Sequence, residues 1–175
     1  MRHSINVAAG RAFLGVVMLD TRFPRPLGDI GHPDSFACPT RHIVVPRAWP
    51  RGIVHAPHAM QALAPHFVQA VQALVAQGAF AVTTSCGFLV LLQHVLQAAV
   101  PVPVRSSSLL GLPALLRQGR RVGVLTISAE ALTDAHLLAA GVAAERLCEV
   151  PVQGVATDSE FARCILGNLP QMDLQ

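Results

Sequence analysis

The sequence predicts an α/β protein with a mostly parallel sheet, and three observations carry this prediction. Short apolar runs bounded by turn residues, typical of buried strands, recur along the chain. Longer runs with helical spacing lie between them, and strands joined by helices pair in parallel. Three strand-like runs end in polar residues, at 20–21, 84–86 and 126–128. Because the carboxyl ends of parallel strands meet at one edge, these polar ends are expected to line one crevice.

The first half of the chain is expected to hold three strands. A loop with many Pro and Gly residues is expected at 22–39, and residues 47–64 are expected to be irregular. Pro65 suits the first position of a helix that Gly78 ends. The strands are expected at 13–19, 42–46 and 80–84.

The second half continues the alternation of helix and strand. Helices are expected at 88–99, 109–117 and 130–140, and a last helix, capped by Asp158 or Ser159, runs to residue 166. Strands are expected at 102–104, 121–126 and 147–152.

Residues 80–89 carry the most distinctive chemistry of the chain. A strand-like run turns polar at Thr83, reaches the thiol of Cys86 and Gly87, and continues into an apolar run with helical spacing. Cys86 is therefore expected at a strand's carboxyl end and just before a helix N-terminus. Ligands bind at such strand ends, and a helix N-terminus stabilises a thiolate. Lone cysteines are more often small core residues, but this position makes Cys86 the best reactive candidate.

Composition restricts the class of protein. With 52% apolar and 13% charged residues, a globular chain with much buried surface is expected, and no apolar run is long enough to span a membrane. The net charge is +3, but the arginines are scattered, so nucleic acid is not an expected partner. The chain has no lysine, which excludes the Schiff base of a pyridoxal phosphate enzyme. Motifs for a P-loop, a dinucleotide site or an α/β-hydrolase elbow are absent from the sequence, which disfavours these three classes of site.

The cysteines and the N-terminus bear on the compartment. The four cysteines lie far apart without a Cys-x-x-Cys pair, so no metal site is expected. Reduced thiols and a cytoplasmic location are expected instead. Residues 1–20 have some features of a signal peptide, but a first strand is favoured because Asp20-Thr21-Arg22 is a poor cleavage site.

Four segments together resemble the aspartate/glutamate/hydantoin racemase superfamily, and the resemblance covers nearly the whole chain. The Thr-Thr-Ser-Cys-Gly-Phe peptide at 83–88 is the most specific of these motifs. The resemblance implies two Rossmann-like α/β lobes with pseudo-two-fold symmetry and a small-molecule site between them. The segments are 15–31, 81–89, 104–110 and 122–126.

The resemblance also implies cofactor-independent chemistry at a carbon next to a carboxylate. In the family, one cysteine from each lobe faces this carbon from opposite sides, and Cys86 matches the cysteine of the first lobe. Inverting a stereocentre by deprotonation needs a base on each face. The chain has no counterpart of the family's second cysteine, which lies in a late Glu-Cys-Thr-Asn-like peptide. Cys148 and Cys164 are expected to be structural, whereas Cys38 lies in the long loop that could approach the site.

Several interpretations therefore remain open. The chain is expected to be an amino-acid racemase-like isomerase with Cys86 as base and a small carboxylate or amino acid as substrate. The alternatives are a non-catalytic remnant or small-carboxylate binding module, or a one-base relative of the decarboxylase or cis-trans isomerase type. The second lobe is expected to be incomplete, because the chain is a fragment, a shortened member or completed by a partner. An exposed apolar sheet edge then predicts a homodimer or poor solubility.

The domain division follows from the same comparison. A first lobe with Cys86 is expected at 1–103 and a partial second lobe at 104–175. Backbone amides and hydroxyls bind the carboxylate in the family, which points to residues near Cys86 and at the polar strand ends. The candidates for substrate binding are Asp20, Thr84, Ser85, Gly87, Phe88, Ser107 and Thr126.

Overall fold

The structure is a computed structural model that describes residues 12–173, and it contains two parallel sheets. The first sheet has the strand order β2-β1-β3-β4 and the second pairs β5 with β6. Every pairing is parallel, which confirms the predicted α/β class. The strands are β1 (Phe13–Met18), β2 (Thr40–Val44), β3 (Ala79–Thr84), β4 (Val104–Arg105), β5 (Val124–Thr126) and β6 (Val152–Gly154).

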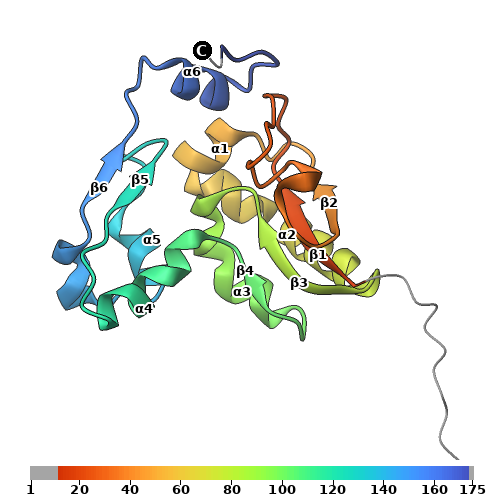
Figure 1. The fold of residues 1–175 in the computed structure, drawn as a ribbon, viewed down its shortest axis with the longest axis horizontal. Helices are drawn as coiled ribbons and strands as arrows, with labels where there is room; N and C mark the ends of the chain where they lie inside the picture. The colour runs from red at the N-terminus through yellow and green to blue at the C-terminus, as the bar shows by residue number, and fades with distance from the viewer. Residues whose placement is uncertain (1–11, 174–175) are drawn as a thin grey trace, which may run out of the picture.

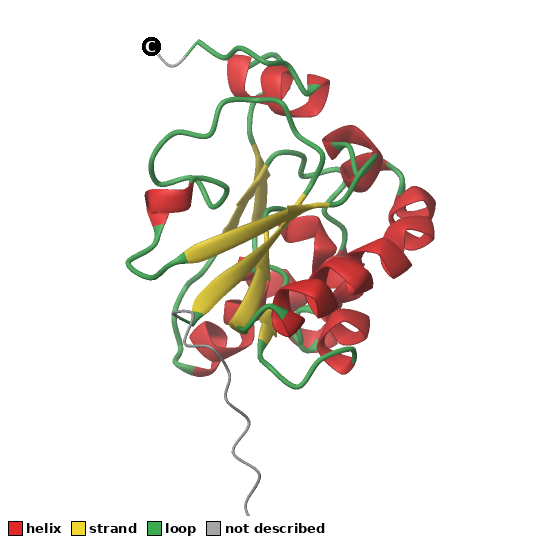
Figure 2. Ribbon diagram, turned by 90° about the vertical axis from the view of Figure 1, so that its right-hand side faces the viewer, coloured by secondary structure: helices red, strands yellow, loops and turns green. Residues whose placement is uncertain are grey.

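The described range also holds six α-helices and four short 3-10 helices, all but α6 lying between strands. In Figure 1 the second sheet lies on one side of the molecule with α4 and α5, and the first sheet lies on the other. The last helix, α6, lies above both and contacts α1. In Figure 2 most helices gather on one side of the sheets. The α-helices are α1 (Pro50–His55), α2 (Pro57–Ala76), α3 (Gln93–Ala98), α4 (Leu112–Arg117), α5 (Asp134–Ala139) and α6 (Glu160–Gly167).

The core of the first sheet forms where α2 packs on β1 and β3. Val16 and Val17 of β1 and Leu74 of α2 are fully buried. Gly15 makes this approach possible, because a Cβ there would lie 3.0 Å from Leu74 Cδ1. This packing fixes the direction of β1 and β3, whose carboxyl ends carry the polar residues noted in the sequence.

The expectation that residues 47–64 are irregular is wrong. They form α1 and the first part of α2, and Pro50 and Pro57 occupy the first turns of these helices. Pro65 does not begin a helix but lies inside α2. Its side chain is exposed, so water can satisfy the carbonyl that a proline leaves without a partner.

Three further expectations need correction. The strand expected at 147–152 is half taken up by the end of a 3-10 helix, Ala144–Glu149, and β6 begins only at Val152. The helix expected directly after Cys86 starts as a 3-10 helix, Gly87–Leu92, and becomes α-helical in α3. The strand expected at 121–126 is shortened to the three residues of β5.

The arrangement of the sheets bears on the predicted division after residue 103. β4 pairs with β3, so the first sheet runs to Arg105, and the second sheet has two strands. The division into lobes at 1–103 and 104–175 stays a prediction. Residues 1–11 of the signal-like start lie outside the described residues. Within the described range, no helix combines the length and the apolar character that crossing a membrane requires.

The joint between β3 and β4 provides a first test of this fold. Thr84 Oγ1 donates a buried hydrogen bond of 2.7 Å to the carbonyl of Ser106, whereas Thr83 Oγ1 donates a more exposed one of 2.8 Å to that of Arg105. We expect Thr84→Val to lower the free energy of unfolding by about 1–3 kcal/mol, because it leaves a buried carbonyl unpaired. The matched control Thr83→Val is expected to cost less than about 1 kcal/mol, because water can replace its hydroxyl.

Urea titration of both variants measures the two costs. Equal losses would contradict the assignment of the buried bond as the stronger constraint.

Candidate functional site

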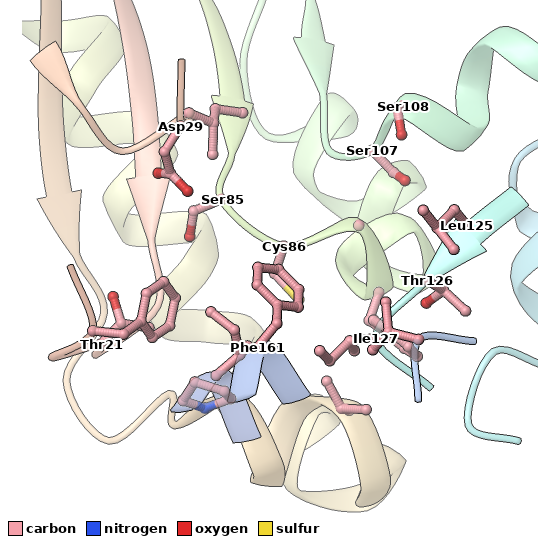
Figure 3. Close-up of a pocket in the computed structure, with 18 of the residues that line it drawn as sticks. Thr21, Asp29, Ser85, Cys86, Ser107, Ser108, Leu125, Thr126, Ile127 and Phe161 are labelled. Atoms are coloured by element: carbon pink, nitrogen blue, oxygen red, sulfur yellow. The ribbon is translucent and has the colours of Figure 1, made fainter. Parts of the chain in front are cut away.

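A cavity of about 550 Å³ lies between the two sheets. The ends of three strands reach it: Thr21 follows β1, Ser85 and Cys86 follow β3, and Thr126 ends β5. Figure 3 shows these side chains around a common space. The three polar strand ends expected to share a crevice therefore lie in one cavity.

Hydrogen bonds of Thr84 and Ser85, the two residues before Cys86, hold the thiol at this cavity. The N–H of Ser85 donates to the carbonyl of Val17 at 2.9 Å, and Ser85 Oγ accepts from the N–H of Leu19 at 3.0 Å. Thr84 Oγ1 donates to the carbonyls of Ser106 and Cys86. The chain between β3 and the following 3-10 helix is thus fixed to both neighbouring strands, and the position of the thiol with it.

Burial raises the pKa of the Cys86 thiol to about 11. The N–H groups of Phe88 and Leu89, in the first turn after the thiol, lower this pKa, and the positive charge of Arg25 lowers it further. The expected stabilisation of a thiolate by the following helix is present, but desolvation outweighs it. The thiol is therefore protonated at neutral pH.

Hydroxyl groups lie on the side of the cavity formed by residues 107–108 and β5. Ser107 Oγ accepts the N–H of Leu109 at 3.1 Å, so its own hydrogen is available to a ligand. Gly87 leaves room for this hydroxyl, because a Cβ at Gly87 would lie 3.3 Å from it. Ser108 and Thr126 line the same side (Figure 3). Together these residues can donate hydrogen bonds to a carboxylate.

One ion pair lies on the opposite side of the cavity. Arg25 Nη1 contacts Asp29 Oδ1 at 2.8 Å, and Arg25 Nη2 donates to Thr21 Oγ1 at 2.8 Å. The Arg25 guanidinium also lies over the ring of Phe23, 4.2 Å from its centroid. Asp29 is held in turn by the N–H of Gly31. Neither Arg25 nor Asp29 was predicted as a site residue, although both lie in the long loop after β1 that was expected to be functional or disordered.

The other predicted site residues have different positions. Asp20 lies outside the residues that line the cavity, and its Oδ2 accepts the N–H of Arg47 at 3.0 Å. Thr84 also lies outside the lining, where it joins β3 to β4. Phe88 is part of the lining, but it is almost fully buried and its ring meets His136 edge to face.

The remaining cysteines do not line the cavity. Cys164 is fully buried in α6 and its thiol faces the carbonyls of Leu169 and Gln171. Cys148 is exposed in the 3-10 helix before β6, and Cys38 is half-buried in the loop before β2. Among residues 12–173, Cys86 is thus the one thiol that lines this cavity. No group of three His, Cys, Asp or Glu side chains in this range is placed to hold a metal ion.

The helix α6 supplies a part of the site that the sequence analysis missed. Phe161 and Ile165 of α6 and Met172 after it line the cavity. Figure 3 shows Phe161 pointing from α6 into the cavity toward Cys86. The available signal was the four-residue spacing of Phe161 and Ile165, which places both on one face of a helix.

Comparison with known proteins gives two kinds of similarity. The chain is 36% identical over 103 residues to dimethylsulfoniopropionate lyase 7 of Emiliania huxleyi, which covers 59% of this chain and 30% of that protein. It is 30% identical over 129 residues to dimethylsulfoniopropionate lyase 3 of the same organism, covering 72% and 33%. The chain thus spans about a third of the length of these relatives. No known family model matches it.

Solved structures share the fold. Unliganded arylmalonate decarboxylase has a TM-score of 0.51 at 18% identity, covering 87% of this chain and 65% of that one. An aspartate racemase homologue from Pyrococcus horikoshii OT3 has a TM-score of 0.51 at 16% identity, covering 87% and 69%. The chain therefore shares the parallel α/β architecture of these two structures, whereas membership of the racemase superfamily and the expected truncation stay predictions.

The raised pKa of Cys86 predicts how the thiol reacts. Because only the thiolate is nucleophilic, we expect the rate of Cys86 alkylation by iodoacetamide to rise about tenfold per pH unit until the pH nears 11. Mass spectrometry of cysteine peptides across a pH series measures this rate, with the exposed Cys148 as internal reference. A rate at Cys86 that levels off below pH 9 would contradict the proposed effect of burial.

Proposed function

We propose that this cavity removes a proton from the carbon next to a substrate carboxylate, with the Cys86 thiolate as the base. The observation that carries this proposal is the position of Cys86 in a cavity whose other side presents the hydroxyls of Ser107 and Thr126. Hydrogen bonds from such groups to the carboxylate stabilise the negative charge that develops as the proton leaves. The cofactor-independent chemistry implied by the family resemblance uses the same two parts, a thiol and a carboxylate site.

Elimination is the reaction that this site supports best. One base suffices: the thiolate takes the α-proton, the C–H electron pair forms a double bond, and the bond to a β-leaving group breaks. For dimethylsulfoniopropionate, the substrate named for the curated relatives, the leaving group is dimethyl sulfide and the other product is propenoate. The proton taken by Cys86 then passes to solvent. A lyase of this type agrees with a single cavity-lining thiol among the described residues.

Racemisation is the second candidate, and the aspartate racemase homologue of the same fold supports it. This reaction needs a second proton donor on the opposite face of the carbon. Arg25 and Asp29 are the charged side chains that line the cavity, and they are paired with each other. The site therefore favours the one-base reaction over inversion of an amino acid.

The homodimer and the cytoplasmic location expected from the sequence remain proposals. The second sheet has two strands, each with a free edge, and Leu125 of β5 is 74% exposed. These features support a homodimer, because unpaired strand edges and exposed apolar residues favour association. The free cysteines support a reducing compartment such as the cytoplasm. A monomer by light scattering at micromolar concentration would contradict the homodimer.

Turnover of dimethylsulfoniopropionate is the first test of the proposed reaction. We expect the protein to release dimethyl sulfide from dimethylsulfoniopropionate and Cys86→Ser to reduce this rate at least about 100-fold, because the base is lost. The control variant Cys148→Ser removes an exposed thiol outside the cavity and is expected to retain the rate.

Single enantiomers of aspartate, glutamate and hydantoins, incubated with the protein in heavy water, provide the second part of the test. Deuterium incorporation at Cα with inversion would replace the lyase with a racemase that has a second base. If the protein neither releases dimethyl sulfide nor exchanges the α-proton of any of these compounds, the proposal of proton abstraction at this site is overturned.

A further inference from the structure

The cavity has two chemically different sides with Cys86 between them. Figure 3 shows Ser107, Ser108 and Thr126 on one side of the thiol and Asp29 on the other. The first side carries hydroxyl groups and no charged side chain among the residues that line it. The second side carries a carboxylate. Proton abstraction next to a carboxylate needs the hydroxyl groups and the thiol, but it does not need the carboxylate on the second side.

The aromatic side chains of the cavity differ in how much of their surface is open. Phe23 is covered by the guanidinium of Arg25, and Phe88 is 4% exposed with its ring against His136. Phe161 is 50% exposed and has no ring or cation contact with another described residue. Its ring is therefore the aromatic surface that a ligand in this cavity can cover.

The charges of Arg25 and Asp29 balance each other, but one carboxylate oxygen of Asp29 is available to a ligand. Arg25 is neutralised by Asp29, and both Arg25 and Gly31 bond to the Oδ1 atom of Asp29. Among the hydrogen bonds of the described residues, none engages Asp29 Oδ2. An aromatic face and a carboxylate oxygen are the groups that attract a methylated cation, which cannot donate a conventional hydrogen bond.

We propose that the cavity binds zwitterions, with the carboxylate on the Ser107–Thr126 side and a methylated sulfonium or ammonium group against Phe161 and Asp29. This inference rests on the proposed function, because it adds a cation subsite to the carboxylate site described there. In Figure 3 Cys86 lies between Asp29 and the Ser107–Thr126 side, and Phe161 points toward it. In the proposed binding mode the α-carbon of a β-onium carboxylate lies against the thiol. Phe161 is then the residue that selects an onium group over a neutral group of the same shape.

A pair of ligands of equal shape tests the cation subsite. One is trimethylammonio-propionate, and the other is its carbon isostere, in which an uncharged tert-butyl group replaces the ammonium group. Isothermal titration calorimetry measures binding of each, and protection of Cys86 from alkylation places it in the cavity. We expect the zwitterion to bind about 2- to 30-fold more tightly than the isostere, the range of a cation–π contact.

Variants of Phe161 separate this effect from packing. Phe161→Leu keeps an apolar side chain without a π-face and is expected to reduce the preference to less than about 2-fold, whereas Phe161→Trp is expected to keep or increase it. The control Phe80→Leu changes a phenylalanine that is 48% exposed in β3 and outside the cavity, and it is expected to retain the preference.

The outcomes separate this inference from the proposed reaction. Equal binding of zwitterion and isostere to the unchanged protein, or an undiminished preference in Phe161→Leu, would overturn the cation subsite whatever the turnover experiment shows. A zwitterion preference that Phe161→Leu removes would support the subsite even where dimethyl sulfide release and exchange both fail.

Discussion

The site depends on the hydrogen bonds that fix Ser85 and its neighbours to the strands on both sides. The backbone of Ser85 is bonded to β1, and its hydroxyl accepts the N–H of Leu19 just after that strand. Thr84 is bonded to the carbonyl of Ser106, and Gln93 in turn accepts the N–H of Ser106 at 2.9 Å. The backbone on either side of the cavity, which carries Cys86 and Ser107, is therefore held by one connected set of hydrogen bonds. The fold thus sets how far apart the thiol and the Ser107 hydroxyl lie.

Burial favours the neutral form of the Cys86 thiol, and the charge of a bound molecule can change this balance. The folded protein favours the neutral thiol, because its pKa is raised from 9.0 to about 11. This contribution to stability is complete below pH 9 and is lost as the pH rises through 11. A bound carboxylate alone would disfavour the thiolate, whereas an onium group close to the thiol would favour it. The proposed zwitterionic substrate would thus bring the positive charge that a Cys86 thiolate needs.

The sequence was sufficient for the position of Cys86 but not for the whole cavity. The change from apolar to polar residues at Thr83 marks a strand end in the sequence. Because the carboxyl ends of parallel strands lie at one edge of the sheet, this was enough to predict where Cys86 lies. Pro65 was misleading because a proline on the exposed side of a long helix is tolerated, so α2 continues through it. Asp20 was a reasonable ligand candidate, yet its carboxylate is used by the N–H of Arg47. Phe161 was missed because its role depends on where α6 packs, and periodicity within a helix does not reveal this.

The placement of α6 also decides which groups flank Cys86 in this chain. Proteins described as a racemase homologue and a decarboxylase share its architecture, so the fold alone does not choose a reaction. The choice must come from the groups that flank Cys86. Here α6 supplies Phe161, and Asn168 at its end fixes the helix by donating to the carbonyl of Asp20 and accepting the N–H of Arg22. Asn168 has a φ of 51°, a left-handed conformation that asparagine tolerates better than most residues. A helix close to the C-terminus is thereby held against the loop that follows β1, and this contact sets the distance between the aromatic ring and the thiol.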